Sequence, residues 1–122
     1  MTKQTVTTGM SGMGGWMAVC RIDDIVPDTG VCARVDDAQV AVFRLGGDAL
    51  HAIDNIDPES GASVLSRGLV GNLGEHVVVA SPIHKQHYDL RTGECLEVPE
   101  LAVRVWQVRR DGDAVSIRRM GG

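Results

Sequence analysis

The sequence predicts an all-β fold, an antiparallel β sandwich or small barrel built from short strands. Strand-like apolar segments recur at intervals of roughly ten residues and are separated by turn signals. The chain contains 15 glycines, as expected for a protein with many tight turns. No segment carries apolar residues at helical spacing over three turns, which argues against a helical bundle.

The first half of the chain is expected to supply four strands. Residues 23–28 form a turn-rich connection with one helical turn, and Asp36-Asp37 turns the chain. Gly46-Gly47-Asp48 indicates a hairpin, because glycine adopts positive φ without a steric cost. The four strands are expected at residues 16–22, 31–35, 39–45 and 49–53.

The second half combines long loops with short strands. Residues 54–74 show no clear periodicity, and a loop of this length in a compact domain is usually functional. The apolar strand 75–80 leads directly into a second loop. Asp111-Gly112 is the strongest hairpin signal in the chain. The remaining strands are expected at residues 88–90, 95–97, 101–108 and 114–118.

One folded domain between two tails is expected. A chain of 122 residues supports a single core. We expect a flexible tail at residues 1–15, the folded domain at residues 16–119 and a short tail at residues 120–122. Aromatic residues make up 3% of the chain, so the core must be built mainly from Val, Ile, Leu and Ala.

Charge and cysteine content narrow the class of protein. The formal net charge of −4 argues against nucleic-acid binding. The sequence contains no run of 18 apolar residues, so we expect no membrane span. Cys20, Cys32 and Cys95 are odd in number and form no C-x-x-C pair, so we expect small buried thiols. Residues 1–15 lack a secretory signal, which favours a cytoplasmic location.

Residues 81–93, S-P-I-H-K-Q-H-Y-D-L-R-T-G, are the most informative segment. They resemble the second ligand loop of a Rieske iron–sulfur domain, which reads C-P-x-H, then an aromatic residue, then D-x-x-x-G. Ser81 stands where that loop has cysteine. The matching positions are Pro82, His84, Tyr88, Asp89 and Gly93.

The resemblance also identifies the position of the first ligand loop, at residues 55–57. A Rieske centre takes two thiolates and two imidazoles, and soft thiolate is what selects an iron–sulfur cluster. By this resemblance Asn55 and Ser81 replace the two cysteines and Asp57 replaces one histidine, so that His84 alone is retained. We therefore expect no cluster, no other cofactor and no metal in this chain.

Residues 16–118 as a whole resemble a Rieske-like domain. Within that group they are most similar to the small subunit of the bacterial assimilatory NAD(P)H-dependent nitrite reductase, whose members commonly lack the cluster ligands. The motifs that carry the likeness are D-N-I-D-P, L-S-R-G-L-V-G and S-P-x-x-K-Q-x-Y-D-L-x-T-G. They begin at residues 54, 65 and 81.

The resemblance implies an accessory, non-catalytic subunit of a cytoplasmic enzyme that reduces nitrite to ammonium in nitrogen assimilation. The implied partner is the large catalytic subunit, which carries FAD, siroheme and a four-iron four-sulfur cluster. The two loops would then form a docking surface, since the same tip of a Rieske domain faces its redox partners. The candidate partner-binding residues are Asn55, Asp57, His84, Lys85, Gln86, His87 and Tyr88.

Several alternatives remain open. The chain could be a ferredoxin-like electron carrier with an unusual ligand set, or a cluster-free β module that binds another partner. His84 and His87 have zinc-like spacing, with Asp57 as a possible helper, and Asp57 with His84 could form an acid–base pair. A cluster of arginines is either a solvated edge or a docking surface for an acidic partner. These arginines are Arg104, Arg109, Arg110, Arg118 and Arg119.

Overall fold

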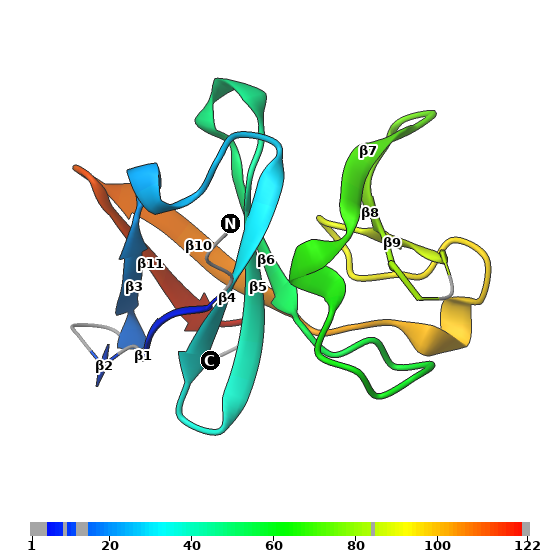
Figure 1. The fold of residues 1–122 in the computed structure, drawn as a ribbon, viewed down its shortest axis with the longest axis horizontal. Coiled ribbons are helices and arrows are strands. Elements are labelled where there is room, and N and C mark those ends of the chain that lie inside the picture. Colours follow the sequence, from blue (N-terminus) through cyan, green and yellow to red (C-terminus); the bar gives the residue numbers. More distant parts are fainter. Residues whose placement is uncertain (1–4, 9, 12–14, 84, 121–122) are drawn as a thin grey trace.

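The predicted all-β fold is confirmed. The structure is a computed structural model that describes residues 5–8, 10–11, 15–83 and 85–120. Its strands form an eight-stranded sheet and a three-stranded sheet (Figure 1). The strands are β1 Thr5–Thr8, β2 Met10–Ser11, β3 Met17–Arg21, β4 Thr29–Val35, β5 Ala38–Arg44, β6 Leu50–Asp54, β7 Leu69–Leu73, β8 His76–Ala80, β9 His87–Asp89, β10 Val105–Asp111 and β11 Ala114–Arg119.

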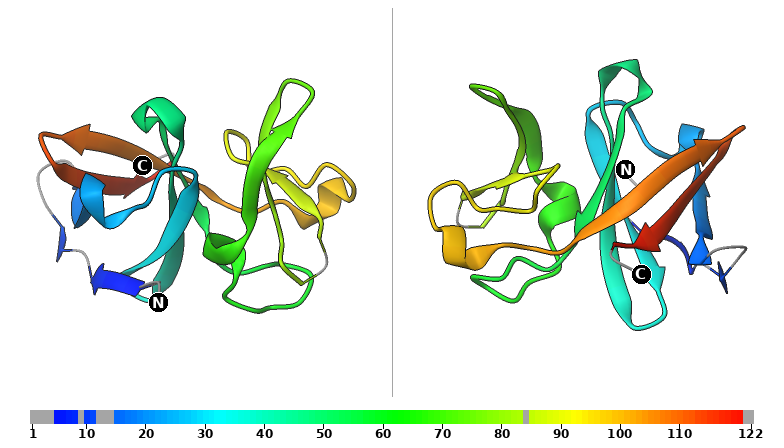
Figure 2. Two further views of the ribbon diagram at one scale, coloured as in Figure 1. Left: turned by 45° about the horizontal axis from the view of Figure 1, so that its top comes forward. Right: turned by 180° about the vertical axis from the view of Figure 1, so that it is seen from behind.

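The large sheet has the strand order β1-β4-β5-β6-β10-β11-β3-β2. All its pairs are antiparallel except the parallel pair of β1 with β4. The sheet curls into a barrel-like shape, so that β1 and β3 lie close together (Figure 2). Val31 and Val35 of β4 and Val40 and Val42 of β5 pack into the interior, since β-branched side chains suit a pleated surface.

The small sheet has the order β7-β8-β9 and packs beside the large one. A second core joins the two sheets: Phe43 and Ile53 come from the large sheet, and Val79 and Tyr88 come from the small one. All four side chains are fully buried. This core holds the loops after β6 and β8 in place relative to each other.

Two predicted boundaries were wrong for physical reasons. Residues 69–73 were expected to be part of a loop, because Gly71 and Asn72 resemble turn signals, but they form β7 through pairing with β8. Strand β10 begins at Val105 rather than at residue 101, because Pro99–Leu101 forms a 3₁₀ turn. The predicted hairpins at Gly46-Gly47-Asp48 and Asp111-Gly112 are confirmed.

The predicted tails lie partly outside the described residues. Positions 1–4, 9, 12–14 and 121–122 are not described. Residues 5–8 and 10–11 form β1 and β2, which pair with β4 and β3. The domain boundaries at residues 15 and 119 therefore stay a prediction.

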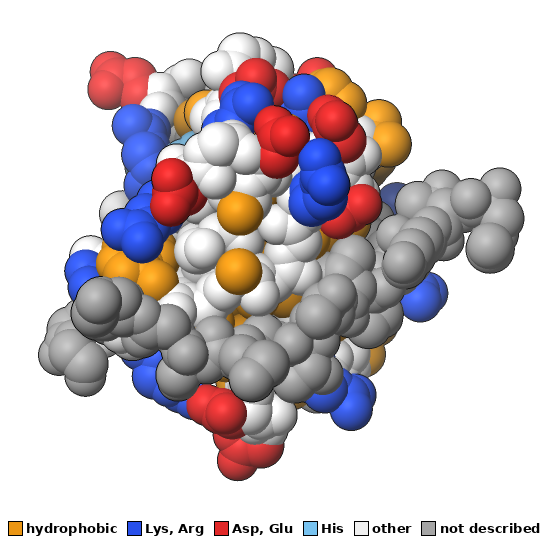
Figure 3. Space-filling view, turned by 90° about the vertical axis from the view of Figure 1, so that its left-hand side faces the viewer, with side chains coloured by type: hydrophobic (Ala, Val, Ile, Leu, Met, Phe, Trp, Pro, Cys, Tyr) orange, Lys and Arg blue, Asp and Glu red, His pale blue; other side chains and the backbone are white. Residues whose placement is uncertain are grey.

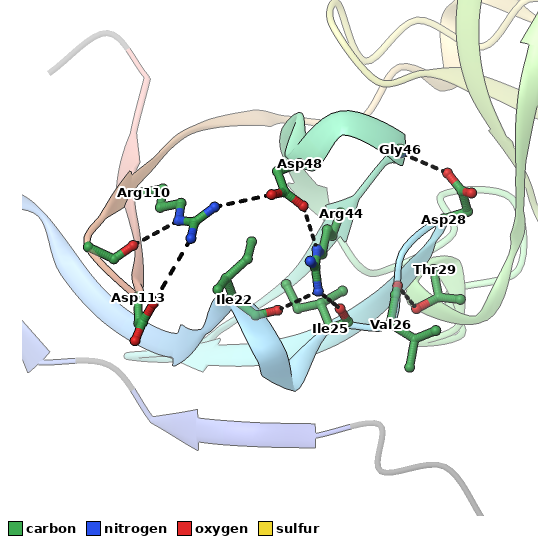
Figure 4. A network of polar contacts seen from close by, with 11 residues as sticks. Ile22, Ile25, Val26, Asp28, Thr29, Arg44, Gly46, Asp48, Arg110 and Asp113 are labelled. Carbon is green, nitrogen blue, oxygen red and sulfur yellow. Dashed lines mark hydrogen bonds and ion pairs between the residues drawn. The ribbon is translucent and has the colours of Figure 1, made fainter.

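Arg44, at the end of β5, contacts two turns that connect strands of the large sheet (Figure 4). Its guanidinium donates to the Ile22 and Ile25 carbonyls at 3.2 and 2.9 Å and to Asp48 Oδ1 at 2.9 Å. Arg110 approaches the other Asp48 oxygen at 3.2 Å, which adds the β10–β11 hairpin to the network. These contacts fix the turn after β3 against the β5–β6 connection.

The arginines near the C-terminus contact groups within the chain. Figure 3 shows side chains of both signs interspersed on the face that carries β3 and the β10–β11 hairpin. Arg109 and Arg118 lie 4.3 and 4.5 Å from the centroid of the Trp16 ring, and Arg119 lies 4.7 Å from that of Trp106. Arg104 lies 3.7 Å from Asp54. These contacts favour the solvated-edge interpretation over a docking patch of one sign.

The three cysteines are free thiols, and Cys32 and Cys95 are buried, as expected. Burial raises the pKa of the half-buried Cys20 to about 11, with Asp24 adding to the effect. Among the described residues, no helix has the length and apolar character needed to cross a membrane.

Candidate functional site

The two predicted ligand loops meet at one place in the molecule. The first begins at Asn55, directly after β6, and the second runs from Ser81, directly after β8, to β9. The Ser81 hydroxyl and the Asp57 carboxyl group come within 2.6 Å of each other. The structure thus brings together three of the four degenerate ligand positions. His84, the fourth, lies outside the described residues.

Asp57 is the centre of this junction. It is fully buried, and its two carboxyl oxygens accept from Ser81 Oγ at 2.6 Å and Tyr88 Oη at 3.4 Å. The backbone N–H of Glu59 adds a bond of 2.8 Å to Oδ1. Burial, together with the neighbouring Asp57, raises the pKa of Tyr88 well above its ordinary value, so the phenol stays protonated and donates.

Backbone hydrogen bonds fold each loop locally. The Asp57 N–H donates to the Ala62 carbonyl at 2.8 Å, and the Gly61 N–H donates to the Asp57 carbonyl at 2.7 Å. Gly61 has φ +77, a conformation that glycine adopts at no steric cost. In the second loop, the Lys85 N–H donates to the Ser81 carbonyl at 2.9 Å. Lys85 itself has φ 61, an uncommon conformation for a residue with a side chain.

Asn55 holds the base of the first loop. Its Oδ1 accepts from the Ser66 backbone N–H at 2.7 Å, and its Nδ2 donates to Cys32 Sγ at 3.5 Å. The side chain is buried, and its amide is therefore committed to contacts within the chain. Burial raises the pKa of the Cys32 thiol, so this sulfur is kept in the neutral form.

Further contacts connect the second loop to its surroundings. Gln86 donates from Nε2 to Glu59 Oε1 across the two loops. The His87 ring lies 2.6 Å from Glu97 Oε2, and its backbone N–H donates to Oε1 at 2.8 Å. Burial acts to raise the pKa of Glu97, but the hydrogen bonds from His87 outweigh it and hold that pKa below its ordinary value. The His87 ring and backbone N–H therefore both interact with the Glu97 carboxylate.

The outer surface of the junction mixes apolar and basic side chains. Ile56 and Ile83 are 43% and 45% exposed and come one from each loop. Lys85, two residues after Ile83 in the second loop, is also exposed and makes no ion pair within the described part of the chain. By contrast, Asn55, Asp57 and Tyr88 are buried. These three partner-binding candidates therefore support the loops through contacts inside the chain and are not themselves part of the exposed surface.

The residues at this site do not fit an iron–sulfur cluster. A Rieske cluster needs two thiolates and two imidazoles, whereas the described positions supply an amide, a carboxyl group and a hydroxyl. Each of these groups already has a hydrogen-bond partner within the chain. Among the described residues, no group of three or more His, Cys, Asp or Glu side chains is arranged to hold a metal.

Sequence reasoning missed several residues of the junction. Cys32 and Ser66 contact Asn55, while Glu59 and Glu97 hold Gln86 and His87. Ser66 belongs to the motif L-S-R-G-L-V-G, but its contact with Asn55 could not be predicted, and the other three residues lie outside the motifs, because these contacts join segments that are apart in the chain. Glu97 lies in the segment 95–97, which was expected to be a strand paired with β9. The isolated bridge from Tyr88 to Cys95 confirms the pairing, but the segment does not form a strand.

The comparisons with known proteins agree with this geometry. The model of the Rieske-like [2Fe-2S] domain family matches residues 15–118. The nitrite reductase (NADH) small subunit of Escherichia coli strain K12 is 44% identical over 107 residues, covering 87% of this chain and 99% of that protein. This chain belongs to the family of nitrite reductase small subunits. The predicted resemblance is thereby confirmed.

Two further relatives extend the comparison. The solution structure of the nitrite reductase [NAD(P)H] small subunit from Erwinia carotovora superposes with a TM-score of 0.76 at 41% identity, covering 90% of this chain and 85% of that one. The nitrite reductase [NAD(P)H] large subunit of Klebsiella oxytoca is 43% identical over 100 residues. That match covers 82% of this chain and 10% of the large subunit. In the Klebsiella protein, a domain like this one is part of the large-subunit polypeptide.

Proposed function

We propose that this chain is the accessory small subunit of a cytoplasmic NAD(P)H-dependent nitrite reductase and supports the reduction of nitrite to ammonium in nitrogen assimilation. It has no catalytic site and no iron–sulfur cluster of its own. Its partner is a large subunit that carries FAD, siroheme and a four-iron four-sulfur cluster. The observation that carries the proposal is a Rieske-type pair of loops in which Asn55, Asp57 and Ser81 are hydrogen-bonded within the chain.

The Klebsiella relative supports the choice of partner. There, a domain 43% identical to this chain forms part of the same polypeptide as the remainder of the large subunit. Two domains joined in one protein often correspond to separate chains that associate in another. We infer that this chain meets the large subunit through a non-covalent interface.

The surface formed by Ile56, Ile83 and Lys85 is our candidate for that interface. The first loop contributes one exposed apolar side chain, and the second loop contributes another together with the exposed cation. Hydrogen bonds from Ser81 and Tyr88 to the buried Asp57 fix the shape of this surface before binding. A fixed surface loses little conformational entropy on association, which favours affinity.

The test is a titration of the purified large subunit with this chain, followed by calorimetry. We expect Lys85→Ala and Gln86→Ala each to weaken binding by about fivefold to tenfold, the range for contacts worth more than 1 kcal/mol. Arg34→Ala serves as a control, because Arg34 is an exposed cation on β4. The Arg34→Ala variant should bind the large subunit with the same affinity as the unmodified chain.

Each outcome has a distinct meaning. Absence of measurable binding by the unmodified chain overturns the accessory-subunit proposal. Binding that is unaffected by either substitution leaves the subunit assignment intact but removes the loops from the interface. The rate of nitrite-dependent NADH oxidation, recorded with and without this chain, then shows whether the complex differs in activity from the large subunit alone.

A further inference from the structure

Strand β7 is an edge strand with a free side. It is the first strand of the β7-β8-β9 sheet, and β8 is its one neighbour among the described residues. Along an antiparallel strand, the backbone groups of successive residues point alternately to the two sides. A strand with a single neighbour therefore presents every second residue's N–H and C=O away from the sheet.

The register identifies which residues these are. The Val77 carbonyl of β8 accepts from Leu90 at 2.8 Å, so Val77 faces β9, and Val78 of β8 must face β7. Val78 pairs with Gly71. Leu69, Gly71 and Leu73 accordingly bond to β8, while Val70 and Asn72 direct their backbone groups to the free side. In the described part of the chain, no hydrogen bond satisfies these groups of Val70 and Asn72.

The side chains of β7 do not block the pairing of another strand with this edge. Leu69 is 81% exposed and Leu73 is 42% exposed, and both point to the same face of the sheet because they are four residues apart. The strand L-V-G-N-L contains neither a charged residue nor a proline. Natural proteins usually protect edge strands with one of these, so an uncharged apolar edge indicates a strand that receives a partner.

A groove runs along the free side of β7. One part has a volume of about 570 Å³ and lies between Leu69 and Val70 on one side and Thr29 and Gly30 on the other. A second part, of about 320 Å³, continues past Asn72 toward Gly46. Asp28 and Val70 line both parts, so the two hollows adjoin each other, and together we call them the channel. On the far wall, Thr29 and Gly30 belong to β4 of the large sheet.

We propose that this channel binds an extended segment of the large subunit, which adds to β7 as a fourth strand. The segment forms backbone hydrogen bonds with Val70 and Asn72 and places apolar side chains over Leu69 and Leu73. Addition of a strand to a sheet edge is a general mode of peptide recognition, in which main-chain bonds give affinity and alternate side chains give specificity. The inference rests on the proposed function and gives the complex a second contact, distinct from the loop surface.

The geometry favours this occupant over a second copy of the chain. Edge-to-edge pairing of two β7 strands would bring β8 of the second copy toward the wall formed by Thr29, Gly30 and Gly46. A lone extended segment has no second strand behind it and avoids that wall. The domain's place within the Klebsiella large subunit also supports a segment from that subunit.

The first test is amide hydrogen exchange in the free chain and in the complex with the large subunit, read by NMR after dissociation. In the free chain, the amides of Val70 and Asn72 should exchange rapidly, and those of Leu69, Gly71 and Leu73 should be protected by β8. In the complex, Val70 and Asn72 should become protected by at least about tenfold, as expected for newly bonded backbone groups. Contact through side chains alone would not change this alternating pattern.

The second test compares two substitutions at one position. Asn72→Pro removes an N–H that points away from β8 and places a ring on the edge, and proline is tolerated at such positions. Asn72→Ala removes the same side chain but keeps the N–H. We expect Asn72→Pro to weaken binding to the large subunit by about tenfold or more and Asn72→Ala by less than about twofold. Leu69→Lys, at a side chain already exposed, serves as a second blocking variant if Asn72→Pro lowers the melting temperature.

The outcomes separate this inference from the proposed function. Strong binding by the unmodified chain, with equal affinity for the variants and rapid exchange at Val70 and Asn72 in the complex, overturns the strand addition and leaves the subunit assignment standing. Failure of the unmodified chain to bind the large subunit overturns both. Protection of the two amides that rises with the concentration of the chain alone would identify a second copy as the occupant and overturn the proposed one.

Discussion

At the scale of single residues, Ser81 has a structural role in the junction of the two loops. Its hydroxyl donates to the fully buried Asp57 carboxyl group at 2.6 Å and accepts from the Ile83 N–H at 3.3 Å. Ser81→Ala should lower the free energy of unfolding by about 1–3 kcal/mol, the cost of removing a donor from a buried carboxyl group. Denaturant unfolding measures this. Ser63→Ala, at an exposed serine of the first loop, is the control and should change stability little.

Asp89 makes stability depend on pH. Burial acts to raise its pKa, but His76 at 2.7 Å and the backbone N–H groups of Arg91 and Thr92 outweigh burial and lower that pKa. A depressed pKa contributes stability that is present above the unfolded value of about 3.9 and is lost as pH falls through the folded value. The unmodified chain should therefore lose stability below about pH 4 more steeply than Asp89→Asn.

Unfolding curves between neutral pH and acid measure this difference. Glu94→Gln changes an exposed carboxylate near the same turn and provides the control. Parallel pH profiles for the unmodified chain and Asp89→Asn would show that Asp89 is not linked to folding in this way.

The residues of the site were predictable to the extent that they belong to one motif. Asn55, Asp57 and Ser81 could be located because the loops keep a Rieske spacing around them. Their burial and mutual contacts could not be predicted, since these depend on the second hydrophobic core, in which side chains of the two sheets pack against each other. Cys32 illustrates the limit: it lies on β4 and meets Asn55 through the folding of the large sheet.

At the scale of elements, hairpins with strong turn chemistry were predictable and strands defined by tertiary pairing were not. Asp111-Gly112 indicates its hairpin locally, and Gly112 has the positive φ that the turn requires. Strand β7 has weak local propensity and exists because β8 pairs with it. Gly68 permits this approach, because a Cβ there would lie 2.3 Å from the Ala80 carbonyl oxygen.

Arg44 offers a test of how elements are joined. Its guanidinium fork reaches the Ile22 and Ile25 carbonyls together with Asp48, a geometry that the lysine ammonium cannot reproduce. Arg44→Lys should lower the free energy of unfolding by about 1–3 kcal/mol through the lost bonds to the two carbonyls. Thermal unfolding checks this, with Arg34→Lys on the neighbouring strand as the matched control. Equal losses in both variants would show that the network of Figure 4 does not hold these elements together.

At the scale of the whole molecule, the two ends of the fold have different roles. At the end with the β10–β11 hairpin, the arginines contact aromatic rings and carboxylates within the chain. At the loop end, Ile56, Ile83 and Lys85 are exposed above a braced polar junction. The groove along β7 lies between the small sheet and the large one. Two candidate contact surfaces thus belong to the half of the molecule that carries the small sheet.

The donor set also predicts how the molecule behaves toward iron. A Rieske centre requires two thiolates and two imidazoles, and this chain has one such ligand among the four positions. After anaerobic reconstitution with iron and sulfide, the purified chain should retain well below two iron atoms per molecule and show no visible absorption from a cluster. Ser81→Cys should behave in the same way, because it restores a single thiolate. Stoichiometric iron and a Rieske-type spectrum in the unmodified chain would instead identify an electron carrier with an unusual ligand set, and would overturn the cluster-free role.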